Sequence, residues 1–519
     1  MKNLAFFILA ILAFGNTRSQ NMRVLNMASS HLVARGISDL GDRYITLSAL
    51  YDSSDTSGVV SAFNKSDHSL IWTRKFSYAH MLTNMVIVEE QDNIGWKRLS
   101  RRRFYVATVV KSKTAQTDVL LLRFNDKGDV LWSKLLDSKA SEDLRCLKSV
   151  NGGAMLSGER QSGNAIDPFF SFIDSNGTVQ WSTYIQQVGY QVNANMCYLD
   201  NHYYFTGNTT TNGYGADDMC LGKLDNSGKL KWYKVIGSSK GEGSHEINTD
   251  GRDLYFGGVQ SDAEKGLAIL KADTSGKLLW RYLFSGSEDE NLHEFNIIND
   301  TIYTLGYTNS FGWGMKDLLL TKLDTGGNLI TMNAIGGAND EVLVRTEIIR
   351  TGSNFLTVWE SNSFASNGAS LIVEFDANLS NGCSKHTGTL TRTNLTINEK
   401  FLTVKGVYDA LKATNLSLKS AAFSIDSIKL ECGTITSISR PSNQTDKYSL
   451  TQTGESIHIE NASPFRAELY DMMGRRLYSN KQMSLSHDID PNVSGSTIIL
   501  VLLTNDQGIS TTQRILVVR

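Results

Sequence analysis

The stretch Gly266 to Phe284, GLAILKADTSGKLLWRYLF, predicts two short β-strands joined by a tight turn, Asp273-Thr274-Ser275-Gly276. Asp at the first position of a type I turn accepts hydrogen bonds from the backbone just ahead of it, and Gly at the fourth position tolerates a positive φ. The flanking residues are apolar and suited to strands. Trp280 offers a large flat surface. We therefore expect a hairpin whose tryptophan is buried between packed sheets.

The same phrase recurs along the chain at a nearly constant interval. Its anchor positions are Trp72, Trp132, Trp181, Trp232, Trp280, Thr331 and Cys383, so the last two copies have lost the tryptophan. Successive anchors are 60, 49, 51, 48, 51 and 52 residues apart. Between anchors the sequence holds a Gly-rich turn, an acidic pair and further short strands, giving about four strands a unit. Four-stranded units repeated at this period are typical of a β-propeller, and the copies predict seven blades.

The sequence divides into five predicted segments. Residues 1–19 have a basic start, an apolar run and Ser19, as in a secretory signal peptide. The propeller is expected over 20–383, a small β region packed on it over 384–432, a linker over 433–447 and a β-sandwich-like domain over 448–519. No other segment is apolar enough to cross a membrane. The predicted fold class is therefore all-β.

The C-terminal domain resembles a known family. The residues that carry the resemblance are Tyr470, Asp471, Gly474, Arg475, Gly495, Gly508 and Arg519. Their order is similar to that of the C-terminal sorting domain of the type IX secretion system of Bacteroidota, although Thr497 stands where the family usually has Tyr. The repeats also resemble the uncharacterised propellers that often precede such domains. The resemblance implies that the partner is the type IX machinery and that the protein is released or held at the outer cell surface.

Charge and cysteine content narrow the alternatives. The net charge of −2 gives no argument for nucleic acid or an anionic membrane, and we interpret the basic run of residues 97–103 as a solvated hairpin tip. Five cysteines are an odd number for an exported chain. Cys146, Cys197 and Cys220 are expected to be buried, while Cys383 and Cys432 bracket the 384–432 region. A disulfide between these two and a pair of free thiols remain equally open. No cysteine or histidine spacing indicates zinc.

Acidic residues recur ahead of one strand in each unit, and two of the units follow them with His-Glu. The acids are Glu142, Asp143, Glu242, Asp289, Glu290, Asp340 and Glu341, and the dipeptides are His245-Glu246 and His293-Glu294. Radial symmetry would bring such positions to one mouth of the ring. The predicted binding residues are Glu242, His245, Asp289, Glu290, His293 and Asp340. Calcium would relieve the repulsion between these carboxylates, and no other cofactor is expected. In the alternative, the acids cap turns and the histidines fill strand ends.

The sequence leaves two classes of function open. The chain contains no GxSxG, HExxH or P-loop motif. The Asp turns resemble the Asp boxes of sialidases, which are structural in those enzymes. We expect a monomeric, non-enzymatic binding or adhesion protein whose ligand is a glycan or a protein. The alternative is a polysaccharide hydrolase or lyase that uses the carboxylates of the mouth as acid and base.

Overall fold

The computed structural model describes residues 22–26, 31–52, 55–78, 81–94, 97–111, 116–186, 191–261, 265–312, 315–337, 339–342, 347–363, 369–381, 388–408, 411–425, 427–430, 449–453, 456–471, 476–489, 497–505 and 510–517. These residues form strands and turns and contain no helix, so the prediction of an all-β fold is confirmed. None of their segments is a helix that could span a membrane. The chain divides into two compact units, Met1–Leu430 and Glu431–Arg519.

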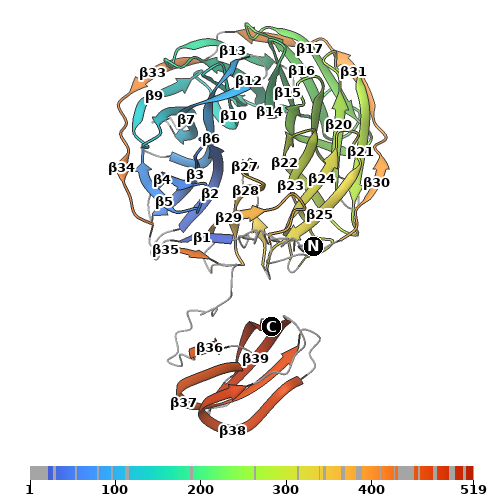
Figure 1. Cartoon of the computed structure of the whole chain (residues 1–519). Helices are drawn as coiled ribbons and strands as arrows, with labels where there is room; N and C mark the ends of the chain where they lie inside the picture. Colours follow the sequence, from blue (N-terminus) through green and yellow to red (C-terminus); the bar gives the residue numbers. More distant parts are fainter. Residues whose placement is uncertain are drawn as a thin grey trace, which may run out of the picture. The chain divides into compact units, whose positions relative to one another are not determined.

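The first unit consists mainly of four-stranded antiparallel meanders, which we number I to VI in chain order (Figure 1). Sheet I contains β2 (His31–Asp39), β3 (Arg43–Asp52), β4 (Asp55–Asn64) and β5 (Leu70–Phe76). Sheet II contains β6 (Met81–Ile94), β7 (Lys97–Lys111), β8 (Thr117–Asn125) and β9 (Val130–Asp137). Sheet III contains β10 (Ser141–Val150), β11 (Gly153–Ser162), β12 (Ala165–Ile173) and β13 (Val179–Gln186).

The next three meanders repeat this pattern. Sheet IV contains β14 (Gln191–Leu199), β15 (His202–Thr209), β16 (Asp218–Asp225) and β17 (Leu230–Gly237). Sheet V contains β18 (Gly241–Thr249), β19 (Leu254–Ser261), β20 (Lys265–Ala272) and β21 (Leu278–Ser285). Sheet VI contains β22 (Glu290–Ile298), β23 (Thr301–Thr308), β24 (Asp317–Asp324) and β25 (Leu329–Ile335).

Sheet VII joins the two ends of the ring. It contains β26 (Glu341–Val342), β27 (Ile349–Thr351), β28 (Asn354–Ser361) and β29 (Ala369–Phe375), followed by the N-terminal strand β1 (Met22–Asn26). Val24 of β1 lies opposite Leu371 of β29. The inner strands of neighbouring sheets contact each other around the ring, and β2 contacts β28 and β29. The ring is therefore closed by a strand from the beginning of the chain.

The repeated Asp turn and tryptophan connect neighbouring sheets from I to VI. In the turn between β20 and β21, Asp273 accepts hydrogen bonds from the backbone N–H groups of Ser275 and Lys277 at 2.9 and 3.0 Å. Gly276 has a φ of +84°, and an added Cβ would lie 3.0 Å from the Trp232 ring of the preceding sheet. Trp280 in turn donates to the carbonyl of Thr325, in the turn of the following sheet, at 3.2 Å. Glycine is required both for the left-handed φ and for the ring packed on it.

At the junction of sheets VI and VII, tryptophan and glycine are lost together. Thr331 replaces the tryptophan, and Leu379 occupies the glycine position with a φ of +62° and 1% exposure. The side-chain amide of Asn333 donates to the Leu379 carbonyl at 2.7 Å. The two degenerate copies thus form one altered junction, which Asn333 and the buried Leu379 hold together.

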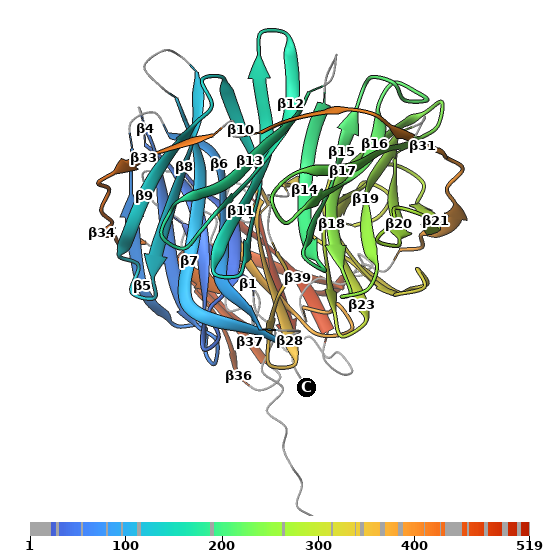
Figure 2. The same cartoon turned by 90° about the horizontal axis from the view of Figure 1, so that it is seen from above.

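The region predicted to pack against the sheets follows their outer edges instead of forming a separate cap. Its strands are β30 (Thr391–Asn394), β31 (Asn398–Leu402), β32 (Lys405–Tyr408), β33 (Lys412–Leu416), β34 (Ala421–Ala422) and β35 (Ser427–Leu430). They pair in turn with the outer strands of sheets V, IV, III, II, I and VII. We call Thr391–Leu430 the outer belt. It runs around the ring in the direction opposite to the sheets, as the orange ribbon shows in Figures 1 and 2.

Apolar side chains of the belt are inserted between neighbouring sheets. Leu395 and Ile397 belong to the core between sheets IV and V, and Leu411 belongs to the core between sheets II and III. Similar insertions are made by Leu402 and Val404 between III and IV, Leu416 and Leu418 between I and II, and Phe423 and Ile425 between VII and I. The belt therefore covers exposed strand edges and also fills the outer ends of the cores between the sheets.

The second unit is a smaller antiparallel sheet with its own core. Its strands are β36 (Ser449–Thr453), β37 (Ser456–Asp471), β38 (Arg476–Ile489), β39 (Thr497–Asn505) and β40 (Ser510–Val517). The core contains Ile457, Ile459, Phe465, Leu469 and Leu503. Of the residues that carried the family resemblance, Tyr470 and Asp471 end β37, whereas Gly474, Arg475, Gly495, Gly508 and Arg519 lie outside the described residues.

Candidate binding site

Four adjacent inner strands share a β-bulge at equivalent places. The pairing register shifts between Leu144 and Cys146 in β10, Asn193 and Asn195 in β14, Ser244 and Glu246 in β18, and Leu292 and Glu294 in β22. A bulge adds one residue to the strand and re-aims the side chains beside it. Cys146, Asn195, Glu246 and Glu294 therefore follow equivalent bulges in sheets III to VI.

These four residues and Lys148 form a continuous chain of polar contacts, which we call the inner polar cluster. The Cys146 thiol donates to the Asn195 Oδ1 at 2.6 Å, and the Asn195 amide donates to the Glu246 Oε2. Lys148 Nζ lies 2.7 Å from the Glu246 Oε1. The carboxyl groups of Glu246 and Glu294 are hydrogen-bonded to each other. Side chains from four sheets thus meet in one network.

The protonation of the cluster follows from burial and these contacts. Burial raises the pKa of Glu246 and raises that of Glu294 further, because the charge of Glu246 adds to the effect on Glu294. Burial opposes the charge on Lys148, yet the carboxylate of Glu246 holds the pKa of this lysine above its usual value. A hydrogen bond between two carboxyl groups requires one proton. Glu294 therefore carries that proton, and the Lys148–Glu246 pair is neutral overall.

The histidines at the bulges lie side by side. The rings of His245 and His293 have centroids 5.7 Å apart and are tilted by 49°. The Nδ1 of His245 lies 2.8 Å from the Leu292 carbonyl oxygen. Because a carbonyl can only accept, Nδ1 carries the proton, which fixes the neutral tautomer of this ring. The structure therefore brings two of the six predicted binding residues together.

The predicted acids occupy the starts of inner strands. Glu242 accepts from the backbone N–H of Ser238 at 2.9 Å and from the Gln260 amide at 2.8 Å. Glu290 accepts from the N–H of Gly286 at 2.5 Å and from the Thr308 hydroxyl at 3.0 Å. Both glutamates are fully buried. These contacts close the loop from the outer strand of one sheet to the inner strand of the next, as the turn-capping alternative described.

The two predicted aspartates have different surroundings. Asp289 accepts from the backbone N–H of Lys265 at 2.9 Å, and its other oxygen lies 3.7 Å from Lys265 Nζ. Asp340 has a buried Oδ1 without a hydrogen-bond partner, and its carbonyl accepts from Asn362 at 3.2 Å. Among the described residues, neither aspartate belongs to a group of three or more close metal-ligating side chains. Cys383 and Cys432 lie outside the described residues, whereas Cys146, Cys197 and Cys220 are buried free thiols, as predicted.

The inner polar cluster was only partly visible in the sequence. Glu246 and Glu294 followed the histidines at the repeat interval, but Cys146 and Asn195 differ from them in chemical type at equivalent positions, and Lys148 lies two residues beyond Cys146. The signal in the sequence that could have revealed the cluster is the presence of polar residues on inner strands, because a buried polar side chain needs a hydrogen-bond partner.

Comparison with known proteins finds similarity in the fold alone. No protein-family model and no curated protein sequence matches the chain. Among solved structures, the Sqt1 protein of Chaetomium thermophilum bound to the N-terminus of ribosomal protein L10 shares 10% identity, with a TM-score of 0.37 over 68% of this chain and 98% of Sqt1. The subtype N10 neuraminidase-like protein of influenza A from a little yellow-shouldered bat shares 9% identity, with a TM-score of 0.37 over 69% of this chain and 98% of that chain.

The endosialidase of phage phi92 shares 10% identity, with a TM-score of 0.37 over 96% of this chain and 87% of that chain. All three proteins are β-propellers. They include a binding protein and glycan-related proteins, so they do not distinguish the two functional classes. The fold of the first unit is propeller-like, and its function has to be argued from its own residues.

Proposed function

We propose that the chain is an exported, seven-bladed β-propeller that binds a ligand without transforming it, with sheets I to VII as the blades. The observation that carries the non-enzymatic part is the direct hydrogen bond between Glu246 and Glu294. Glycoside hydrolases hold their two carboxyl groups about 5 to 9.5 Å apart, on either side of the scissile bond. Two carboxyl groups in contact leave no room for a sugar between them.

Both oxygens of Glu246 also have other partners. Lys148 and Asn195 each engage one oxygen of Glu246, so the base that a hydrolase would need is held in an ion pair. A satisfied network of this kind stiffens the inner strands. We propose that the ligand, a glycan or a protein segment, is bound by groups on the rigid frame beside this network, and that His245 and His293 contribute to its recognition.

The test is a screen of the purified full chain on a glycan array and against a set of polysaccharides. We expect saturable binding to at least one glycan or protein ligand and no reducing-end release from any polysaccharide. His245→Ala with His293→Ala should weaken binding at least tenfold, while His202→Ala, on β15, serves as the matched control. Hydrolysis that is lost in Glu294→Gln would instead establish the enzyme alternative.

We also propose that residues 448–519, within the second unit, are a type IX sorting domain, and that the mature protein is released into the medium or held on the outer cell surface. The proposal rests on the sequence resemblance and on the separate core of this unit. Deleting residues 447–519 in the native host should leave a folded propeller that accumulates in the periplasm. Unchanged amounts at the surface and in the medium would contradict the sorting role.

We further propose that the propeller is monomeric. The belt pairs with the outer strands of sheets I to V and with β1 of sheet VII, so these edges are not available for pairing with a second copy. Light scattering should give a mass close to 57.4 kDa, less any cleaved signal segment.

A further inference from the structure

A buried aspartate and glutamate meet at equivalent places between sheets II and III, IV and V, and VI and VII. The pairs are Asp118 with Glu142, Asp218 with Glu242 and Asp317 with Glu341, at the start of the third strand and near the start of the following inner strand. A third equivalent position lies at the end of the outer strand. It is Gly237 beside the second pair and Gly336 beside the third, but Asp137 beside the first.

The glycines show how little space this third position has. A Cβ added to Gly237 would lie 1.7 Å from the Asp218 Oδ1, and one added to Gly336 would lie 1.7 Å from the Asp317 Oδ1. A side chain at this position therefore sits directly against the neighbouring carboxylate. Beside Asp118 the position is occupied by a third carboxylate, that of Asp137.

The first pair also has fewer donors than its counterpart in sheet IV. Asp218 accepts from the backbone of Tyr214 and Gly215 at 2.9 and 3.3 Å, and Glu242 accepts from Ser238 and Gln260. Within the described residues, Glu142 receives a hydrogen bond on one oxygen, from the Ser138 hydroxyl, and its buried Oε2 has no partner.

The nearest guanidinium is engaged elsewhere. Arg160 of β11 occupies the position that Gln260 has on β19 of sheet V, but its Nε donates to the Ser138 hydroxyl at 2.9 Å. Its guanidinium carbon lies 4.5 Å from the centre of the Tyr184 ring. No ion pair joins Arg160 to Asp118, Asp137 or Glu142 in the part of the chain that the structure describes. Among the described residues, the three carboxyl groups therefore face one another without a direct ion pair, and the charge of Arg160 reaches Glu142 only through the Ser138 hydroxyl.

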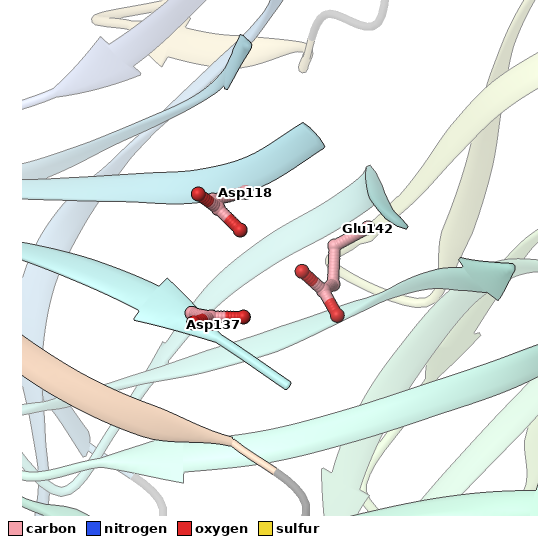
Figure 3. A group of neighbouring side chains, drawn as sticks. All are labelled: Asp118, Asp137 and Glu142. Carbon is pink, nitrogen blue, oxygen red and sulfur yellow. The ribbon is translucent and has the colours of Figure 1, made fainter. Parts of the chain in front are cut away.

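The geometry of the three carboxylates fits one cation. One oxygen from each of Asp118, Asp137 and Glu142 lies within 4.8 Å of the others. Figure 3 shows an oxygen of Glu142 directed toward the space between the two aspartates. The Glu142 side chain is 1% exposed and reaches into the group, and its Oε2 is buried without a hydrogen-bond partner among the described residues. Oxygens that ligate one calcium ion at 2.3 to 2.6 Å lie at most about 5 Å apart.

We propose that Asp118, Asp137 and Glu142 bind one calcium ion, with water completing the coordination. Carboxylate oxygens are ligands of hard divalent cations. Asp137 is half-buried and gives the ion a route from solvent. Asp118 and Asp137 belong to sheet II and Glu142 to sheet III, so the ion joins two neighbouring sheets. This site differs from the one predicted at Glu242, Asp289, Glu290 and Asp340.

The test uses the full chain after chelation, titrated with calcium chloride by calorimetry and melted with and without the ion. We expect one calcium per chain with a Kd on the order of 10⁻⁴ to 10⁻³ M, as in extracellular modules. The melting temperature should rise by several degrees when the ion is added. Asp137→Asn should abolish both responses. In chelator this variant should melt no lower than the wild type, because it removes a repelling charge.

The matched control is Asp218→Asn, which changes the equivalent pair in sheet IV and should keep the calcium response. Glu142→Gln is a second variant that should lose it. Absence of heat and of a melting shift in the wild type at millimolar calcium overturns the proposal. A response that persists in Asp137→Asn also overturns it, and a response to magnesium but not calcium overturns the choice of ion.

Discussion

Leu395 is the residue at which the contribution of the belt to stability is best measured. It is 2% exposed and lies in the core shared by sheets IV and V. Its N–H donates to the Arg281 carbonyl at 3.2 Å, and its carbonyl accepts from the Arg281 Nε at 2.9 Å. The backbone is thus fixed by two hydrogen bonds that a change of side chain retains. Leu395→Ala removes packing alone.

The expected loss follows from the burial. Truncating a fully buried leucine to alanine costs about 2 to 5 kcal/mol, depending on how far the surroundings collapse into the space. Leu395 sits at the outer end of the core, where partial collapse is easy, so we expect about 3 kcal/mol. In urea the midpoint should fall with an unchanged slope, because the area exposed on unfolding hardly changes.

Thr396 provides the control, because it is the next residue and its side chain is exposed. Thr396→Ala should change the free energy of unfolding by less than about 0.5 kcal/mol. Equal midpoints for the two variants would show that the belt rests on the surface and adds no packing between the sheets. That result would refute the reasoning for every apolar residue that the belt inserts.

Three further predictions concern the buried polar groups. Burial raises the pKa of Glu341 to about 7, so between about pH 4.5 and 7 the folded state holds a proton that the unfolded state has lost. The free energy of unfolding should therefore fall by about 2 kcal/mol as the pH rises through this range, allowing for partial solvent screening. Glu341→Gln should remove this pH dependence in melting experiments. Gly237→Ala should cost more than about 2 kcal/mol, since its Cβ would lie 1.7 Å from the Asp218 Oδ1, whereas Gly241→Ala, with its nearest neighbour at 3.8 Å, should be nearly neutral in the same urea titration. Lys148→Met should cost about 3 to 5 kcal/mol by leaving Glu246 unpaired; Lys148→Met with Glu246→Gln should recover most of that loss, and a double variant no more stable than the single one would contradict the ion pair.

The hairpin turn of each repeat was predictable because its conformation depends on residues that are close in the sequence. The Asp and Gly of each turn, such as Asp273 and Gly276, and the tryptophan that follows lie within eight residues of each other, and each has a local conformational reason. The partner of the tryptophan is the turn of the next copy, so the period of the repeat also indicated which sheets are neighbours.

The sequence indicated that the outer belt contains strands, but it did not indicate which sheets these strands would pair with. The alternation at Leu395-Thr396-Ile397 predicted a strand-like segment with two buried residues. Its neighbours in space, however, are edge strands that lie more than a hundred residues earlier, and an edge carries no sequence mark of which strand will cover it. The inner polar cluster was not predicted for a similar reason. Glu242 and Asp289 follow the repeat, and their donors lie in sheet V or in the turn that leads into it. The cluster around Glu246 instead depends on side chains from three other sheets.

The reversed course of the belt has a consequence for the order of folding. Leu430 of β35 lies opposite Arg23 of β1, so the last strand of the ring unit pairs with the first. Closing a loop of about four hundred residues is entropically unfavourable until other contacts hold its ends together. The pairing of β35 with β1 is therefore expected to form after the ring has brought these two strands together. We expect the same pairing to open before the rest of the ring, and the rate of proteolysis reports that opening when cleavage is faster than reclosing.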